Sequence, residues 1–529
     1  MRARSFLPAI LLLLLSTAVR AAEIPDWVKN QGRSARYPDQ SYLTGYGMDK
    51  PAKGEGQAAS LQRAQDYARS YLIQRIRVRI QSTMGSSAEE RDQKVTTLVS
   101  NAVVATSSLE LQGLDVETYW DDDEEMSHAL AYVSREKLSQ IYSANLTKLR
   151  SEIHGRLDAG KAFEGSGAST RALGEYVACF SLFQQLEESR VILAAAKTAS
   201  MNAFDELEGE VSKGEPGVEV VREAIQRLLQ RPLITPDDLA WYLVYCLSEQ
   251  AGLKNIPVLV SALTYRDTKM GSPFSRYFRQ VLENKLLEVA GWNPVQQAGV
   301  TEPHVRDLRR AGARAAGAEY ILRGTYWEEE HAVRFIATLT RVSDGKTIAS
   351  AETVAGDSVV GSARLNIKPQ NFAAALSDQK QFSADEVVGA GLSLEVWTNK
   401  GTEDLIFTKG ERMQAYVRVN MPCYIRFVYH LADGRRALLV DSYYIDQSKV
   451  NVVYPIPGEF ECDEPYGAEF LQAFARTEPF EAVQTEKVGG YDILKDDLKG
   501  FLSQQRGMKR VSQKTLQAET RIVMTTMEK

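Results

Sequence analysis

The sequence predicts a multi-domain α+β protein: an N-terminal α+β domain, a helical middle, an α/β domain and a C-terminal β-sandwich. The apolar residues alternate along the chain between helical spacing and the period of two that marks a half-buried strand. The 529 residues exceed what one core usually holds, and the 44% hydrophobic content suffices for several cores. The predicted boundaries are 1–21 (signal peptide), 22–134, 135–253, 254–360, 361–388 (linker) and 389–529 (β-sandwich).

The first residues have the composition of a secretory signal. Arg2 and Arg4 precede the apolar run Phe6–Leu15, and small residues lead to a cleavage site before Ala22. We therefore expect a periplasmic protein, peripheral to the outer membrane at most. No lipid anchor is expected because the first cysteine is Cys179, and no later apolar run reaches transmembrane length.

The region 22–134 predicts helices and strands in one α+β domain. A helix from about Gln57 has an apolar, small-residue face. Alternation at Ile76, Val78 and Ile80 then predicts a strand whose outer face carries Arg75, Arg77 and Arg79. A further helix over Ala88–Val104 and strands over Leu111–Trp120 and His128–Val133 complete the domain.

The region 135–253 is predicted to be helical. Apolar residues from Leu138 to Leu157 recur every three or four positions, which indicates a long amphipathic helix. Helices through Tyr176–Leu186 and over Glu187–Glu210 follow, and Thr235-Pro236 is typical of a helix start. A helical bundle acting as a spacer is the preferred interpretation, because no second copy of a helical-hairpin repeat is found.

The last two domains are predicted from strands and tight turns. In 254–360, an apolar run at Ile256–Leu263 and helices over 274–289 and 303–316 precede strands joined by the Asp344-Gly345 turn. The polar stretch 361–388 is interpreted as a linker. Beyond it, several short alternating strands and the Asp433-Gly434 turn indicate a β-sandwich.

Three regions resemble known families. Trp27, the Tyr42–Gly47 segment, the Ala-rich helix and the hairpin around Tyr119-Trp120 resemble the LPP-twenty lipoprotein family. The stretch Gly317–Gly324 and its hairpin resemble the N-terminal domain of TolB, whose fold is related to those of FlgO and CsgG. Segments such as Phe407–Glu411 resemble a C-terminal domain of unknown function from bacterial envelope proteins. The overall order is similar to that of the flagellar protein FlgT, which implies docking or assembly rather than catalysis.

The four cysteines permit two disulfides in an oxidising compartment. Two fall in the helical region and two in the β-rich end, so we predict Cys179–Cys246 and Cys423–Cys462. Four buried free thiols are the alternative.

Motifs for catalysis or cofactor binding are not apparent. The five histidines lie on separate elements without a second ligand at metal spacing, so no metal or cofactor is expected. Gly45-Tyr46-Gly47 and Gly389-Ala390-Gly391 are interpreted as turns, and the acidic run Asp121–Glu125 as a solvated turn rather than a calcium site. The row Arg75, Arg77, Arg79 is the candidate site for an anion or an acidic partner, with a solvated sheet face as the alternative.

These observations predict a non-catalytic envelope protein, a scaffold or assembly factor that docks on an outer-membrane or basal-body-type complex. Peptidoglycan or lipopolysaccharide are further candidate partners. The net charge of −6 argues against nucleic acid. Two other functions stay open: an enzyme acting on peptidoglycan or an exported polymer, whose carboxylates are not recognisable among 69 acidic residues, and a periplasmic ligand-binding sensor.

Overall fold

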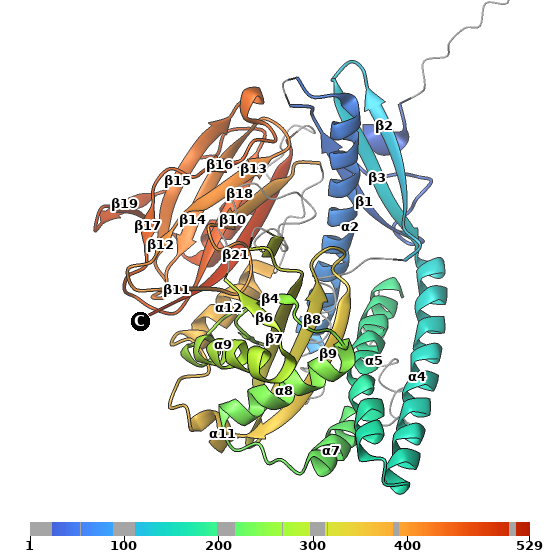
Figure 1. Cartoon of the computed structure of the whole chain (residues 1–529). Helices are drawn as coiled ribbons and strands as arrows, with labels where there is room; N and C mark the ends of the chain where they lie inside the picture. Colours follow the sequence, from blue (N-terminus) through green and yellow to red (C-terminus); the bar gives the residue numbers. More distant parts are fainter. Residues whose placement is uncertain are drawn as a thin grey trace, which may run out of the picture.

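A computed structural model describes residues 24–52, 54–87, 112–197, 217–266, 268–296, 313–314, 316–383, 391–506 and 515–528. The predicted signal peptide, the predicted helix Ala88–Val104, the end of the helix predicted over Glu187–Glu210 and most of the helix predicted over 303–316 lie outside these residues. The chain is a mixed α+β multi-domain protein, as the sequence predicts (Figure 1). No helix within these ranges is long and apolar enough to cross a membrane.

The N-terminal unit packs a helix on an antiparallel sheet. Its strands are β1 (Tyr42–Asp49), β2 (Asp115–Asp121) and β3 (Met126–Ser134), in the order β1-β3-β2, after the short helix α1 (Asp26–Lys29). Helix α2 (Gln57–Ser87) crosses one face of this sheet. Gly45 and Gly47, predicted to form a turn, lie inside β1. A Cβ at either position would meet helix backbone oxygen at 2.2 Å, so glycine here permits close approach of α2.

The strand predicted at residues 76–80 does not form. These residues continue α2, which runs without a break to Ser87. Ile76 is buried in the same core as Ala64, Ala68 and Leu72. A short alternation of apolar and charged residues fits either period, and here the helical face that begins at Ala64 continues through it.

The helical region contains α4 (Arg135–Gly165), α5 (Ser169–Ala196), α7 (Val218–Leu229) and α8 (Pro236–Ala251). The predicted apolar stripe of α4 is buried from Leu138 to Leu157. Helix α8 has the predicted start, with Thr235 as its N-cap and Pro236 at its first position, and Thr235 also forms a capping box with Asp238. The two helices predicted around Glu187 are one continuous helix, α5, as far as Ala196.

The next unit is a mixed sheet covered by helices. Its strand order is β6-β4-β7-β8-β9, with β5 beside β7. The strands are β4 (Pro257–Val260), β5 (Thr264–Tyr265), β6 (Asn293–Val295), β7 (Tyr320–Glu329), β8 (Ala332–Arg341) and β9 (Thr347–Gly356). Helix α9 (Pro273–Lys285) and the turn η1 (Leu286–Ala290) lie between β5 and β6 in sequence.

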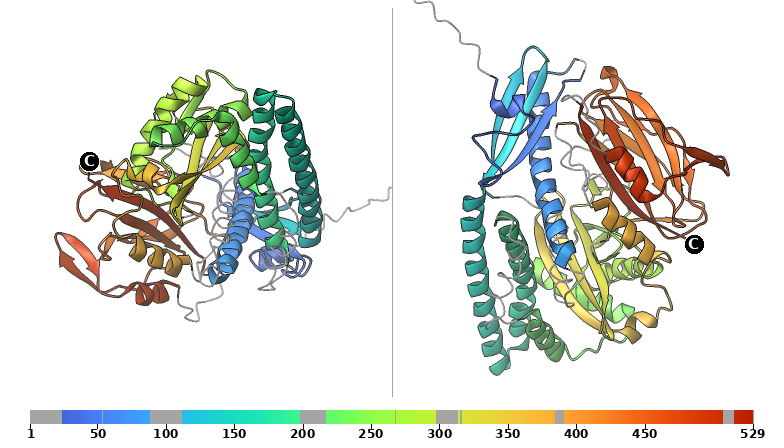
Figure 2. Two further views of the ribbon diagram at one scale, coloured as in Figure 1. Left: turned by 90° about the horizontal axis from the view of Figure 1, so that it is seen from below. Right: turned by 180° about the vertical axis from the view of Figure 1, so that it is seen from behind.

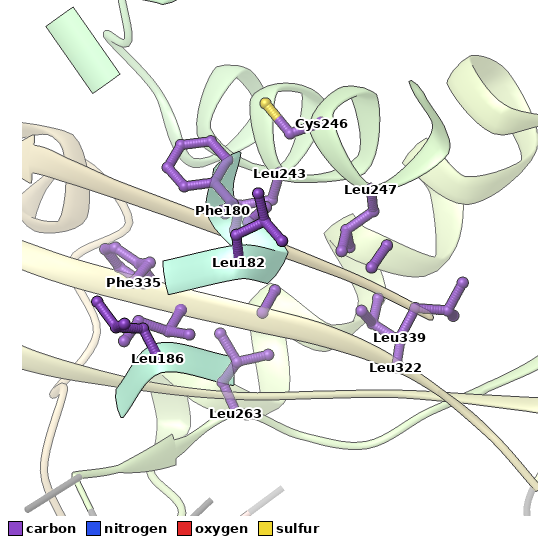
Figure 3. Close-up of a cluster of buried hydrophobic side chains, with 14 of the residues drawn as sticks. Phe180, Leu182, Leu186, Leu243, Cys246, Leu247, Leu263, Leu322, Phe335 and Leu339 are labelled. Atoms are coloured by element: carbon purple, nitrogen blue, oxygen red, sulfur yellow. The ribbon is translucent and has the colours of Figure 1, made fainter. Parts of the chain in front are cut away.

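The helical region shares a hydrophobic core with this sheet. Figure 3 shows Phe180 and Leu186 of α5 and Leu243 of α8 gathered over Phe335 and Leu339 of β8. The same cluster continues to Leu43 and Leu72 of the N-terminal unit. The helices are therefore part of a packed body rather than a separate spacer.

The segment 361–388, predicted as a linker, carries helix α12 (Phe372–Ser383), and the short helix α11 (Asp357–Gly361) ends where that segment begins. Ala375 and Phe382 of α12 are buried in a cluster with Phe470 and Phe474 of the C-terminal unit. The polar appearance of this stretch reflects a short helix that buries only one narrow face.

The C-terminal unit is the predicted β-sandwich. One sheet has the order β10-β13-β16 and the facing sheet the order β11-β21-β18-β14-β15-β20-β19, with a small pair β12-β17. The strands of the first sheet and the small pair are β10 (Leu394–Thr398), β13 (Ala415–Val419), β16 (Tyr454–Pro455), β12 (Arg412–Met413) and β17 (Phe460–Glu461). Those of the second are β11 (Leu405–Thr408), β14 (Cys423–His430), β15 (Arg436–Ile445), β18 (Ala468–Arg476), β19 (Thr485–Val488), β20 (Tyr491–Leu494) and β21 (Gln517–Met527). Helices α12 and α13 (Leu498–Arg506), gold and red in the right-hand view of Figure 2, cover the outer face of the larger sheet.

Candidate functional site at the domain junctions

The predicted row of arginines is not a row on a sheet face. Arg75, Arg77 and Arg79 lie on α2, where residues two apart are rotated by about 200° around the helix axis. Arg75 is 48% exposed and donates to the Thr44 carbonyl oxygen at 2.9 Å. It joins α2 to β1. The side chains of Arg77 and Arg79 lie outside what the structure describes, and an anion-binding role stays a prediction without the strand geometry that suggested it.

The cysteines are free thiols in the structure, so the predicted pairs Cys179–Cys246 and Cys423–Cys462 are not present. Each thiol is packed in its own apolar surroundings; Cys246 appears among leucines in Figure 3. Cys179 Sγ donates to the Glu175 carbonyl 3.4 Å away and Cys462 Sγ to that of Phe407 at 3.5 Å. Burial raises the pKa of all four thiols, to about 12 for Cys423, which disfavours the reactive thiolate.

Two histidines are buried in polar contacts rather than grouped at a metal site. His128 Nδ1 lies 2.7 Å from the Tyr46 hydroxyl, and His430 Nε2 lies 2.9 Å from Gln472 Oε1. Burial lowers the pKa of His430 to about 3, so it is neutral at ordinary pH. Within the described ranges, no three histidine, cysteine or acidic residues come together as metal ligands.

The first junction joins the N-terminal unit to the β-sandwich. The side chain of Asn420 is fully buried and donates to the carbonyl oxygens of Met48, at 2.5 Å, and Gly391, at 2.7 Å. Its own oxygen accepts from the Ser393 amide at 2.7 Å. The Tyr71 hydroxyl of α2 donates to the Leu392 carbonyl. One amide side chain thus satisfies backbone groups on both sides of the junction.

Asp49 forms the second contact of this junction. It is 0% exposed, and Arg63 Nη2 donates to its carboxylate at 2.8 Å. Asn451 of the sandwich donates to the other carboxylate oxygen at 2.9 Å and to the Lys50 carbonyl at 3.0 Å. Burial raises the pKa of Asp49, and the Arg63 guanidinium opposes that rise. A buried ion pair is therefore completed by a residue from the opposite end of the chain.

The second junction joins the α/β unit to the sandwich. The Gly271 amide donates to Thr525 Oγ1 of β21 at 2.9 Å. The segment 365–371 contacts both units through hydrogen bonds. The Phe274 amide donates to the Asn366 carbonyl at 3.1 Å, while Asn371 Nδ2 donates to the carbonyls of Ala432 and Ala468 at 2.9 Å.

A pocket of about 460 Å³ opens at this second junction. One wall is α9, the second is the segment 365–370, and the third is formed by Tyr466, Gly467 and the end of β21. Its charged lining consists of Arg276, Lys368 and Glu528. The pocket is of ordinary size for a small-ligand site and lies where such sites often occur, between domains.

Sequence patterns did not identify these junction residues. Asn420 ends a predicted strand, Asn371 lies in the predicted linker, and no element is predicted at Asn451. The one available signal was a polar residue at the point where the alternating strand pattern is interrupted, such as Asn420 before Met421-Pro422. Such a residue is usually a turn residue, so spacing alone gave no reason to expect buried contacts.

No protein family and no curated protein sequence matches this chain. Among solved structures, the LpoB C-terminal domain from Salmonella enterica is 18% identical and covers 22% of this chain and 98% of its own, with a TM-score of 0.18. TolB from Acinetobacter baumannii is 12% identical over 42% of this chain and 58% of its own, with a TM-score of 0.16. The secreted protein HP1454 from Helicobacter pylori is 10% identical over 65% of this chain and 96% of its own, with a TM-score of 0.19. These TM-scores do not establish a common fold with any of the three proteins.

Proposed function

We propose that this chain is a non-catalytic scaffold or assembly factor of the bacterial envelope that docks on an outer-membrane or basal-body-type complex. The observation that carries the proposal is the interlocking of its units. Asn420 and Asn451 of the last unit complete hydrogen bonds inside the first. A body held at both ends of its sequence keeps separate surfaces at fixed positions, which a scaffold requires.

The signal-like opening of the sequence supports the periplasmic location. The lining of the junction pocket does not favour the alternative of a polysaccharide hydrolase at this pocket, because it carries one carboxylate, Glu528, beside two cations. Hydrolysis of a glycosidic bond ordinarily needs two carboxyl groups flanking the bond. The resemblance of 22–134 to the LPP-twenty family and of the domain order to FlgT stays a prediction.

Site-specific photo-crosslinking in intact cells tests the proposal. A photoreactive residue is placed at exposed positions on three separate units: Thr118 of β2, Lys148 of α4 and Tyr491 of β20. A scaffold is expected to give crosslinks to identifiable envelope proteins from at least two of the three positions, and to fractionate with membranes. Recovery as a free periplasmic protein without crosslinks from any position would overturn the proposal.

A further inference from the structure

One face of helix α9 is directed at the junction pocket. Pro273, Arg276, Tyr277 and Gln280 are spaced i, i+3, i+4 and i+7, so they share one side of the helix, and all four line the pocket. Phe274, Phe278 and Leu282 on the other side are buried in the core. Packing of that apolar side fixes the rotation of α9 and hence the direction of the polar side.

The pocket walls are held in place by backbone hydrogen bonds. Gly467 and Thr526 exchange main-chain bonds of 3.1 and 2.8 Å, and Thr525 Oγ1 accepts a hydrogen bond from the amide of Gly271, two residues before α9. A Cβ on Gly467 would lie 2.4 Å from Asn371 Oδ1, so the close approach of the third wall requires glycine. A pocket with walls fixed in this way is preformed, which reduces the entropy lost on binding.

Arg276 provides the available positive charge. No described residue forms an ion pair with it. Lys368, in contrast, pairs with Glu328, and its Nζ lies 5.1 Å from the ring centroid of Tyr265, so its charge is already partly neutralised by these partners. Glu528 is exposed, at the end of the β21 wall. A guanidinium without a carboxylate partner favours a ligand that brings its own, because the planar fork can bind a carboxylate through two parallel hydrogen bonds.

The rest of the polar lining consists of neutral amides. Gln280, Asn366 and Gln370 each offer one acceptor and two donor hydrogens at the pocket, and Tyr277 is 37% exposed there. Amide groups match hydroxyl groups, which also donate and accept. An exposed tyrosine ring gives a flat apolar surface with a polar end.

We propose that this pocket binds an acidic sugar, such as a hexuronic acid unit of a polysaccharide. Arg276 holds the sugar carboxylate, Tyr277 packs on the C–H face of the ring, and the three amides bind its hydroxyl groups. A peptide carboxylate is the less suitable ligand, because extended peptides are usually held by main-chain pairing to a free strand edge. Here β21 is paired with both β11 and β18. The proposal is independent of the scaffold function.

Isothermal titration calorimetry on the purified full chain tests this assignment with three probes. These are trigalacturonate, the neutral trisaccharide maltotriose, and N-acetyl-alanyl-alanine with a free carboxylate. We expect trigalacturonate to bind at least tenfold more tightly than maltotriose or the dipeptide. Arg276→Gln is expected to weaken trigalacturonate binding tenfold or more and to remove its advantage over maltotriose, whereas Tyr277→Ala weakens both sugars.

Arg279→Gln is the matched control. Arg279 lies on the same helix but pairs with Glu283 at 3.0 Å and does not line the pocket, so its loss is expected to leave trigalacturonate binding unchanged. Arg276→Lys, which keeps the charge and loses the fork, gives an intermediate affinity, and unchanged melting temperatures show that the variants are folded. Absence of trigalacturonate binding, equal binding by Arg276→Gln and the wild type, or tighter binding of the dipeptide would each overturn the assignment.

Discussion

Glu469 is a buried carboxyl group whose ionisation is disfavoured. It is 3% exposed, and its oxygens accept from the Tyr429 hydroxyl at 2.6 Å and the Ala432 amide at 3.1 Å. Burial raises its pKa to about 7, and these hydrogen bonds oppose the rise only in part. Its position in β18, inside an apolar strand pattern, gave no sign of this environment.

The shifted pKa of Glu469 predicts a defined pH dependence of stability. The unfolded chain releases this proton near pH 4.5 and the folded chain near pH 7, so stability falls as pH rises between these values. Glu469→Gln removes this fall. The unfolding free energies of the variant and the wild type are measured by urea titration at pH 4 and pH 8. The difference between variant and wild type should shift by about 3 kcal/mol in favour of the variant from pH 4 to pH 8, because one pKa unit corresponds to about 1.4 kcal/mol.

Glu461→Gln serves as the control for this titration. Glu461 is an exposed carboxyl group of the same unit. Its replacement should leave the difference in unfolding free energy between pH 4 and pH 8 the same as in the wild type. Parallel pH profiles for Glu469→Gln and the wild type would show that Glu469 ionises normally in the folded chain.

Individual elements could be predicted from sequence where one face is buried and the other exposed. Helix α4 is such a case, and so are the hairpin β8–β9 and the turn at Asp433-Gly434, whose residues suit tight turns. Helix α2 could not be predicted to its end, because its buried residues meet both the N-terminal sheet and α5. The buried residues of α2 then occupy more than one face of the helix. A short alternation of apolar and charged residues in such a helix resembles the pattern of a strand.

The packing of α2 on β1 depends on glycine at position 47. We expect Gly47→Ala to destabilise the protein by about 3 kcal/mol or more, since the new Cβ would lie 2.2 Å from the Ala64 carbonyl oxygen, which is fixed in the helix. Thermal unfolding of the purified variant measures the loss.

Gly174→Ala in α5 provides a control with the opposite sign. A Cβ at Gly174 meets nothing within 4 Å, and alanine is favoured over glycine in a helix by about 1 kcal/mol. This variant should be as stable as the wild type or slightly more stable. Equal effects of the two substitutions would contradict the close helix–strand contact.

At the scale of the whole molecule, the decisive contacts join residues far apart in sequence. Asn420 and Met48 are separated by 372 positions, and Asn451 and Asp49 by 402. The sequence predicted the β-sandwich and several of its strands, but it carried no periodic signal for how the units dock. Docking depends on single buried amides and on one-residue fits such as Gly391 against Met48.

Asn420 is expected to be the most sensitive residue of the first junction. Asn420→Ala leaves two carbonyl oxygens and one amide buried without partners, each at a cost of about 1 kcal/mol or more. Hydrogen exchange at the amides of β1 and of residues 391–394 should therefore accelerate about 100-fold, as local opening becomes easier by about 3 kcal/mol. Asn366→Ala, which removes an exposed amide, should leave these rates unchanged; similar rates in both variants would argue against the buried bonds.

The most direct test of the central claim is a distance measurement between the first and last units in the free protein. Nitroxide labels are placed at Glu124, in the turn after β2, and at Glu486 of β19, both exposed. Double electron–electron resonance should give one narrow distance distribution in the wild type and a broader one in Asn420→Ala. A broad or multiple distribution in the wild type would contradict the rigid body on which the scaffold proposal depends.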